Sequence, residues 1–153
     1  MPLTKIDKSI VIHAPTEKVY AYIKDIDNFA KAQPPETETK VLSKPEGGPK
    51  VGQISRMSMK AGGQVYEWEN EITEVTENKK MSAIQKGGPF KRLEWTQTCE
   101  PTNGETKYSL TCEYELPYSI VGKIIDKLKI EKEVDRNFDY YIKKTKELIE
   151  KSA

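Results

Sequence analysis

The sequence predicts an α+β domain in which a curved antiparallel sheet wraps around one long C-terminal helix. Three observations indicate this class. Residues 37–114 form a run of alternating segments separated by short turns, which is typical of antiparallel strands. Residues 124–151 have a helical apolar stripe, and one strand with two short helices precedes the run. A sheet with one apolar face needs a cover, and the long helix can provide it. The length of 153 residues suits a single domain, 1–153.

The chain begins with a predicted strand at residues 5–12, where isoleucines alternate with polar residues and Lys8 shares the apolar face. A helix is expected next. Pro15 suits its first turn because proline already has a helical φ and needs no amide donor there. The helix should extend to about Lys24.

A second short helix is predicted before the main run of strands. Asp25 or Asp27 can cap it, because a side-chain oxygen at that position accepts from the free amides of the first turn. We expect the helix to extend through Phe29. The pair Pro34-Pro35 then stops it, since proline removes a helical hydrogen bond.

The run contains further strands, predicted at 37–44, 53–60, 64–76, 79–86 and 90–99. The third of these has glutamates on one face and mostly aromatic and apolar residues on the other. Such alternation indicates one solvated face and one covered face. The alternation slips between Ile72 and Val75, so we expect a β-bulge there.

Asn103-Gly104 predicts a tight hairpin between residues 93–102 and 105–114. A two-residue turn at this point pairs Cys99 with Tyr108, Gln97 with Leu110, Trp95 with Cys112, and Leu93 with Tyr114. All of these residues then share one face of the sheet. That agreement supports the register, because a slip by one residue would reverse every side chain.

Residues 116–122 are expected to connect this hairpin to the helix at 124–151. The apolar stripe of the helix comprises Ile124, Ile125, Leu128, Val134, Phe138, Tyr141, Ile142, Leu148 and Ile149. Charged residues interrupt it at Glu131, Lys132 and Asp135. We interpret the interruption as a solvated face. The alternative is that the helix leaves the sheet there and lines a cavity mouth.

The segments SIVIHAPTEKVYAYIKDIDNF, PEGGPKVGQ and YEWENEITEVTENKKM, followed by the C-terminal helix, form an ordered set over nearly the whole chain. This set resembles the helix-grip superfamily, also called START-like, Bet v 1-like or SRPBCC, of polyketide cyclase/dehydrase and lipid-transport type. The resemblance implies a seven-stranded antiparallel sheet gripping the helix, two short helices between strands 1 and 2, and an internal cavity. Members bind lipids, hormones, polyketides or quinones, and a minority are enzymes.

The composition excludes several classes of partner and location. The net charge is +1, so the chain has no excess of basic residues of the kind that nucleic-acid binding needs. No stretch approaches the roughly 20 apolar residues of a membrane span. The N-terminus has no apolar signal-peptide core. We therefore expect a cytoplasmic protein with no nucleic-acid partner and no membrane span, as a monomer or a dimer.

Residues 47–53, GGPKVGQ, have two glycines at the spacing of a phosphate-binding loop. Such a loop needs Lys and then Ser or Thr after the second glycine, and a helix must follow. Here Gln53-Ile54 follow and a strand is predicted. We interpret the segment as a turn beside a cavity entrance.

The sequence offers no convincing metal, cofactor or nucleophile site. His13 is the single histidine, at an expected surface corner, and the two cysteines are interpreted as small inward hydrophobic residues. Glu67, Glu69 and Glu71 point outward by alternation, where a carboxyl keeps its ordinary acidity. Arg56 is also expected outside, unless a bulge turns it toward an acidic ligand. We expect no cofactor and no metal.

A ligand cavity is predicted on the concave face, because aromatic residues there are mixed with buried amides, unlike a dry aliphatic core. Two methionines could form an adaptable wall or simply fill the core. The predicted lining residues are Met57, Met59, Tyr66, Trp68, Asn70, Gln85, Trp95, Gln97, Tyr108, Tyr114, Phe138 and Tyr141. We name no catalytic residue.

The leading functional hypothesis is a carrier or sensor of a small hydrophobic or amphipathic ligand, lipid-like, polyketide-like or quinone-like. A polyketide cyclase or dehydratase is the alternative, and it needs an acid–base pair that only tyrosines and Arg56 could supply, so the interpretation leans away from an enzyme. A second alternative is a co-chaperone or accessory module with an exposed apolar patch around residues 116–122.

Overall fold

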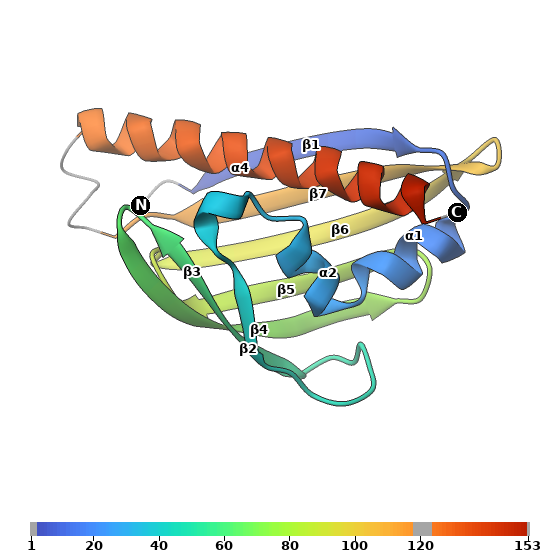
Figure 1. The fold of residues 1–153 in the computed structure, drawn as a ribbon, viewed down its shortest axis with the longest axis horizontal. Coiled ribbons are helices and arrows are strands. Elements are labelled where there is room, and N and C mark those ends of the chain that lie inside the picture. The colour runs from blue at the N-terminus through green and yellow to red at the C-terminus, as the bar shows by residue number, and fades with distance from the viewer. Residues whose placement is uncertain (1–2, 118–123, 153) are drawn as a thin grey trace.

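The computed structural model describes residues 3–117 and 124–152, and its seven strands form one antiparallel sheet in the order β1-β7-β6-β5-β4-β3-β2. The strands are β1 (Thr4–Ile12), β2 (Lys40–Ser43), β3 (Ile54–Ala61), β4 (Gln64–Thr76), β5 (Lys80–Gly87), β6 (Arg92–Thr102) and β7 (Glu105–Glu115). The helices are α1 (Thr16–Ile23), α2 (Ile26–Lys31), the 3-10 turn η1 (Pro35–Thr37) and α4 (Ile124–Lys151). The long helix lies across the sheet, with α1 and α2 on the same side (Figure 1). This arrangement confirms the predicted α+β helix-grip fold.

The predicted hairpin and bulge are both confirmed. Asn103 and Gly104 have positive φ angles of 51° and 80°, as a primed two-residue turn requires. The turn pairs Trp95 with Cys112 and the flanking residues as expected. In β4 the register shifts between Ile72 and Glu74, at the predicted bulge.

Two predictions at the ends of elements were wrong. Strand β2 is Lys40–Ser43 rather than 37–44, because η1 precedes it and Glu38 has a left-handed φ of 44°, which an extended strand does not permit. In α4, Leu128 is 54% exposed, whereas Ile130, outside the predicted stripe, packs against the core. The predicted connection lies mostly outside the described residues, at 118–123.

Lys8, which the alternation placed on the apolar face of β1, is explained by α4. Its ammonium lies 3.2 Å from a carboxylate oxygen of Asp135 and 3.8 Å from one of Asp139. These aspartates are four residues apart, so they lie one turn apart on the same side of the helix. The aliphatic stem can therefore cover the sheet while the charge reaches the helix. Asp135 thus belongs to a strand–helix contact, and its neighbour Lys132 is exposed, as the solvated-face interpretation expected.

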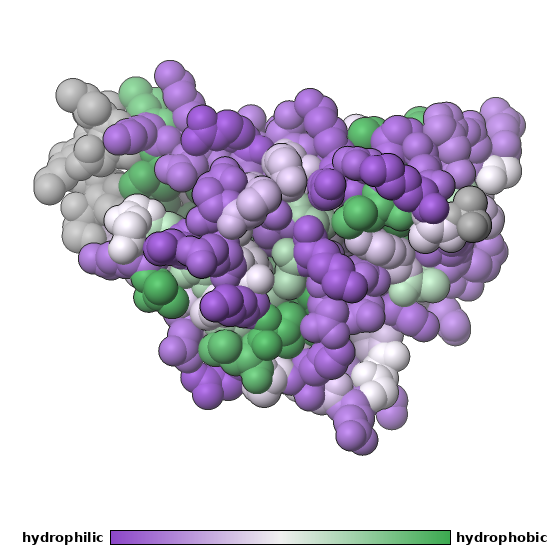
Figure 2. Space-filling model, viewed as in Figure 1, coloured by the Kyte–Doolittle hydropathy of each residue, from purple (hydrophilic) through white to green (hydrophobic). Residues whose placement is uncertain are grey.

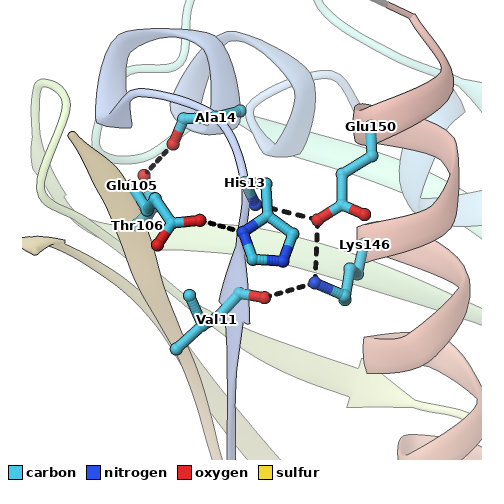
Figure 3. Close-up of polar contacts among 7 residues, drawn as sticks. All are labelled: Val11, His13, Ala14, Glu105, Thr106, Lys146 and Glu150. Carbon is cyan, nitrogen blue, oxygen red and sulfur yellow. Dashed lines mark hydrogen bonds and ion pairs between the residues drawn. The ribbon is translucent and has the colours of Figure 1, made fainter. Parts of the chain in front are cut away.

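The C-terminal end of α4 is attached to the end of β1 by polar contacts (Figure 3). Glu150 accepts from the backbone amide of His13 at 2.8 Å and from Lys146 at 2.8 Å, and these two donors lower its pKa. Lys146 also donates to the carbonyl of Val11 at 2.6 Å, and the His13 ring contacts Glu105. These contacts hold the exposed side chain of His13 at the corner that follows β1.

Hydrophilic side chains cover most of the face drawn in Figure 2, and hydrophobic groups form separate small areas among them. The large exposed hydrophobic residues of the described chain are Leu3, Val11, Leu42, Val51, Ile54, Val65 and Leu128. Among the described helices, none is both long enough and apolar enough to cross a membrane.

Candidate functional site

A cavity lies on the concave face, enclosed by the sheet, α4 and the segment around α2. Its walls are mostly aromatic and aliphatic, with a few amides and a hydroxyl. The lining residues are Phe29, Gln33, Thr39, Met59, Trp68, Asn70, Gln85, Phe90, Leu93, Trp95, Gln97, Leu110, Val134, Asn137, Phe138 and Tyr141. The enclosed volume is 80 Å³, well below the several hundred cubic ångströms of a typical small-molecule site.

Two larger hollows adjoin this cavity. One, of 580 Å³, shares Asn70 and Trp95 with it and extends to the loop that contains Gly47 and Gly48. The other, of 390 Å³, shares Met59, Phe90, Val134 and Asn137. A ligand of ordinary size would therefore extend from the enclosed cavity into one of the hollows, or would displace lining side chains.

Most of the predicted lining residues meet at this cavity. Met59, Trp68, Asn70, Gln85, Trp95, Gln97, Phe138 and Tyr141 line it. The other predicted residues lie elsewhere: Tyr66 lines the hollow of 390 Å³, and Met57, Tyr108 and Tyr114 are fully buried side chains with no exposed area. Alternation predicts which face of a strand a residue occupies, but it does not predict whether packing leaves space beside that residue.

The lining residues that sequence reasoning missed come mainly from helices and loops. Phe29 belongs to α2, and its ring stacks on Trp95 with centroids 6.0 Å apart and an interplanar angle of 11°. It also contacts Tyr141 at a centroid distance of 5.3 Å. A six-residue helix gives too short a pattern to reveal an inward face. Leu93 and Leu110 were placed on the inner face by the hairpin register, which was the available signal for them.

Gln97 accepts hydrogen bonds from two tyrosines at the floor of the cavity. Its Oε1 accepts from the hydroxyl of Tyr108, and from that of Tyr141 at 3.1 Å. Gln97 is 1% exposed, so this shared acceptor stabilises two hydroxyls that water cannot reach. Burial raises the pKa of Tyr141 to about 12 and the pKa of Tyr108 well above its ordinary value.

Two further amides face the cavity from β4 and β5. Asn70 Oδ1 accepts from the indole Nε1 of Trp95 at 3.2 Å. Gln85 Nε2 is buried without a hydrogen-bond partner among the described residues. A buried amide nitrogen without a partner costs about 1–3 kcal/mol.

No residue of the described cavity lining is charged, and Tyr141 is its one titratable side chain. Because its pKa is raised to about 12, the hydroxyl stays protonated at neutral pH and can donate but not act as a general base. Arg56 lies outside, 3.1 Å from Glu67 and 56% exposed, as the alternation predicted. Among the described residues, no group of three or more His, Cys, Asp or Glu could hold a metal.

The loop at residues 47–53 makes its own hydrogen bonds and continues into β3, as the turn interpretation expected. The Gly52 amide donates to Ile72 O at 2.8 Å, and the amide of Gln53 donates to Lys50 O at 3.1 Å. The Lys50 amide donates to the Gln53 side chain at 2.9 Å. Amides occupied in this way do not form the open cradle that a phosphate needs.

Cys99 and Cys112 should be unreactive in the folded protein. Both thiols are free and buried, and burial raises the pKa of each to about 12. The thiolate is the reactive form, so we expect almost no reaction with Ellman's reagent at mildly alkaline pH, and reaction of both thiols in concentrated guanidinium chloride. Rapid labelling of either thiol under native conditions would contradict the buried placement.

The geometry defines a protein of the helix-grip class, with a concave apolar cavity between the sheet and its C-terminal helix. Residues 4–150 match the family model described as polyketide cyclase / dehydrase and lipid transport. The chain therefore belongs to this family, within the START-like and Bet v 1-like (SRPBCC) superfamily. No curated protein gives a significant match.

Solved structures agree with this fold. The Zhui aromatase/cyclase from Streptomyces sp. R1128 is 15% identical with a TM-score of 0.78, covering 97% of this chain and 94% of that one. The protein TTHA0849 from Thermus thermophilus is 25% identical with a TM-score of 0.76, covering 99% of each chain. A START superfamily protein from Mycobacterium smegmatis is 16% identical with a TM-score of 0.73, covering 97% of this chain and 99% of that one.

Proposed function

We propose that this protein binds a small hydrophobic or amphipathic molecule between its sheet and α4, as a carrier or sensor. One observation supports this most strongly: an uncharged cavity lined by both tryptophans of the chain also presents buried amides, one of them unpaired. Amides are costly in a wall that has no ligand role, because a buried polar group loses free energy unless it is hydrogen-bonded. Burial of apolar ligand surface provides affinity at roughly 25 cal/mol per Å² before ordering costs.

A polyketide cyclase or dehydratase is the second candidate, favoured by the family description and by the likeness to the Zhui aromatase/cyclase. The described lining offers this chemistry one titratable group, the protonated hydroxyl of Tyr141. That hydroxyl already donates its one proton to Gln97, so it could polarise a carbonyl oxygen only by giving up this hydrogen bond, and a base would have to come from elsewhere. The lining therefore favours binding over catalysis.

Native mass spectrometry tests the proposal. We expect the purified protein to retain a lipid or small metabolite whose mass is lost on denaturation, or else to bind the neutral apolar probe N-phenylnaphthylamine with saturation at one molecule per chain. A bare mass together with no binding of the probe would overturn the proposed function. Turnover of a polyketide-like substrate that is lost in Tyr141→Phe, with binding retained, would favour the enzyme.

A further inference from the structure

Three amides in the cavity wall differ in what they can still offer a ligand. They are Asn70, Gln85 and Gln97, on the neighbouring strands β4, β5 and β6. An amide oxygen can accept two hydrogen bonds and an amide nitrogen can donate two. The protein's own contacts use the oxygens of Asn70 and Gln97 and leave the nitrogens free.

Gln97 is the amide whose oxygen is most fully occupied by the protein's own hydrogen bonds. The hydroxyls of Tyr108 and Tyr141 both donate to its Oε1, so both acceptor positions of that oxygen are occupied. Within the described part of the chain, its Nε2 makes no hydrogen bond to the protein. The group that Gln97 can present to the cavity is therefore its NH₂.

Asn70 presents the same group. The indole N–H of Trp95 can only donate, so it fixes Asn70 Oδ1 toward itself and leaves Nδ2 as a donor. Gln85 favours neither donors nor acceptors, because its Nε2 is buried away from the cavity space and its Oε1 also makes no hydrogen bond among the described residues. Gln33 and Asn137 also line the cavity, but they are only partly buried and keep a free oxygen as well as a free nitrogen. They therefore do not discriminate between ligands that donate and ligands that accept a hydrogen bond.

The absence of charge in the described lining further restricts the chemical class of the ligand. A carboxylate transferred into this wall would lose its hydration without meeting a cation, which costs far more than amide donors restore. An ammonium group would meet amide hydrogens and no counter-charge. A neutral oxygen acceptor needs only the donors that the wall provides.

We propose that the ligand is an uncharged apolar molecule with a carbonyl-type acceptor, whose oxygen lies against the free NH₂ groups of Asn70 and Gln97. This inference rests on the proposed function, because it specifies the chemistry of the molecule in the same cavity. It excludes free fatty acids and amines as preferred ligands.

Titration calorimetry with matched probes tests the inference. The probes are α-tetralone, its hydrocarbon tetralin, and tetralin carboxylate, which share one ring frame. We expect the ketone to bind about tenfold more tightly than the hydrocarbon, since one or two net hydrogen bonds give about 1.4 kcal/mol. The carboxylate should bind more weakly than the ketone.

Two variants locate the preference. Gln85→Met removes an amide whose oxygen and nitrogen make no hydrogen bond among the described residues, so it should leave both folding and the ketone preference intact. Asn70→Asp keeps the acceptor for Trp95 and removes the NH₂, and its affinities are measured at mildly alkaline pH. Asn103→Asp makes the same change in the exposed β6–β7 turn and serves as the control. Asn70→Asp should reduce the ratio of ketone to hydrocarbon affinity severalfold, whereas Gln85→Met and the Asn103→Asp control should not.

The outcomes separate the two proposals. Hydrocarbon binding as tight as ketone binding, tightest binding of the carboxylate, or a ketone preference unchanged in Asn70→Asp would overturn the inference and leave the proposed function standing. If none of these probes binds while N-phenylnaphthylamine does, only the inference is overturned; if N-phenylnaphthylamine also fails to bind and no ligand is retained, the proposed function is overturned as well.

Discussion

Gln97→Leu should lower the free energy of unfolding by about 3 kcal/mol, because it removes the one acceptor shared by two buried tyrosine hydroxyls. Leucine has a similar volume, so the cost arises from polar groups left unpaired rather than from a new void. Urea unfolding followed by circular dichroism measures the change. A loss below about 1 kcal/mol would show that the hydroxyls find other partners.

A matched background isolates this polar contribution. When Tyr108→Phe and Tyr141→Phe are present, Gln97→Leu no longer orphans a hydroxyl, because both partners are then apolar. We expect the cost of the leucine substitution to be much smaller in that background. An equal cost in both backgrounds would assign the effect to packing instead.

Asn137→Phe should weaken binding of N-phenylnaphthylamine at least tenfold. Asn137 is a partly buried residue of α4 that lines both the enclosed cavity and the hollow of 390 Å³, so a phenyl ring there would occupy ligand space. The control is Arg136→Phe, which makes a similar change at the adjacent exposed position. Calorimetric titration of the probe measures both variants.

The test depends on the difference in probe affinity between the Asn137→Phe and Arg136→Phe variants. Unfolding midpoints should stay close to that of the wild type in both, since neither residue belongs to the buried core. Equal weakening by both substitutions would indicate a general effect on α4. Unchanged affinity in Asn137→Phe would place the probe away from this cavity.

Strand alternation and turn chemistry predicted the sheet almost completely. The register from Asn103-Gly104 placed Gln97, Trp95 and Leu93 on one face, because a two-residue turn leaves a single pairing. Alternation failed at the start of β2, because Glu38 adopts a left-handed conformation that an alternating pattern does not reveal. The predicted burial of Leu128 was wrong for a similar reason. The apolar stripe of α4 does not show which of its residues the sheet covers, and Leu128 is exposed.

The cavity was less predictable than the sheet. Aromatic residues mixed with amides indicated the concave face, but the split between lining and fully buried residues depends on how α2 and α4 cover it. Tyr108 is buried beneath Gln97, whereas Tyr141, which donates to the same oxygen, reaches the cavity. The contribution of Phe29 depends on the tertiary position of a very short helix, so no local pattern encoded it.

The nitrogen–proton NMR spectrum of the indole groups tests the central claim most directly. The chain has two tryptophans, Trp68 and Trp95, and both line the cavity, so two indole signals report on its occupation. On titration with N-phenylnaphthylamine, we predict that both signals shift together, saturate at one probe per chain, and show intermolecular Overhauser effects to the probe's rings. Indole signals that stay fixed while amides elsewhere shift, or no shift at all, would contradict a ligand cavity between the sheet and α4.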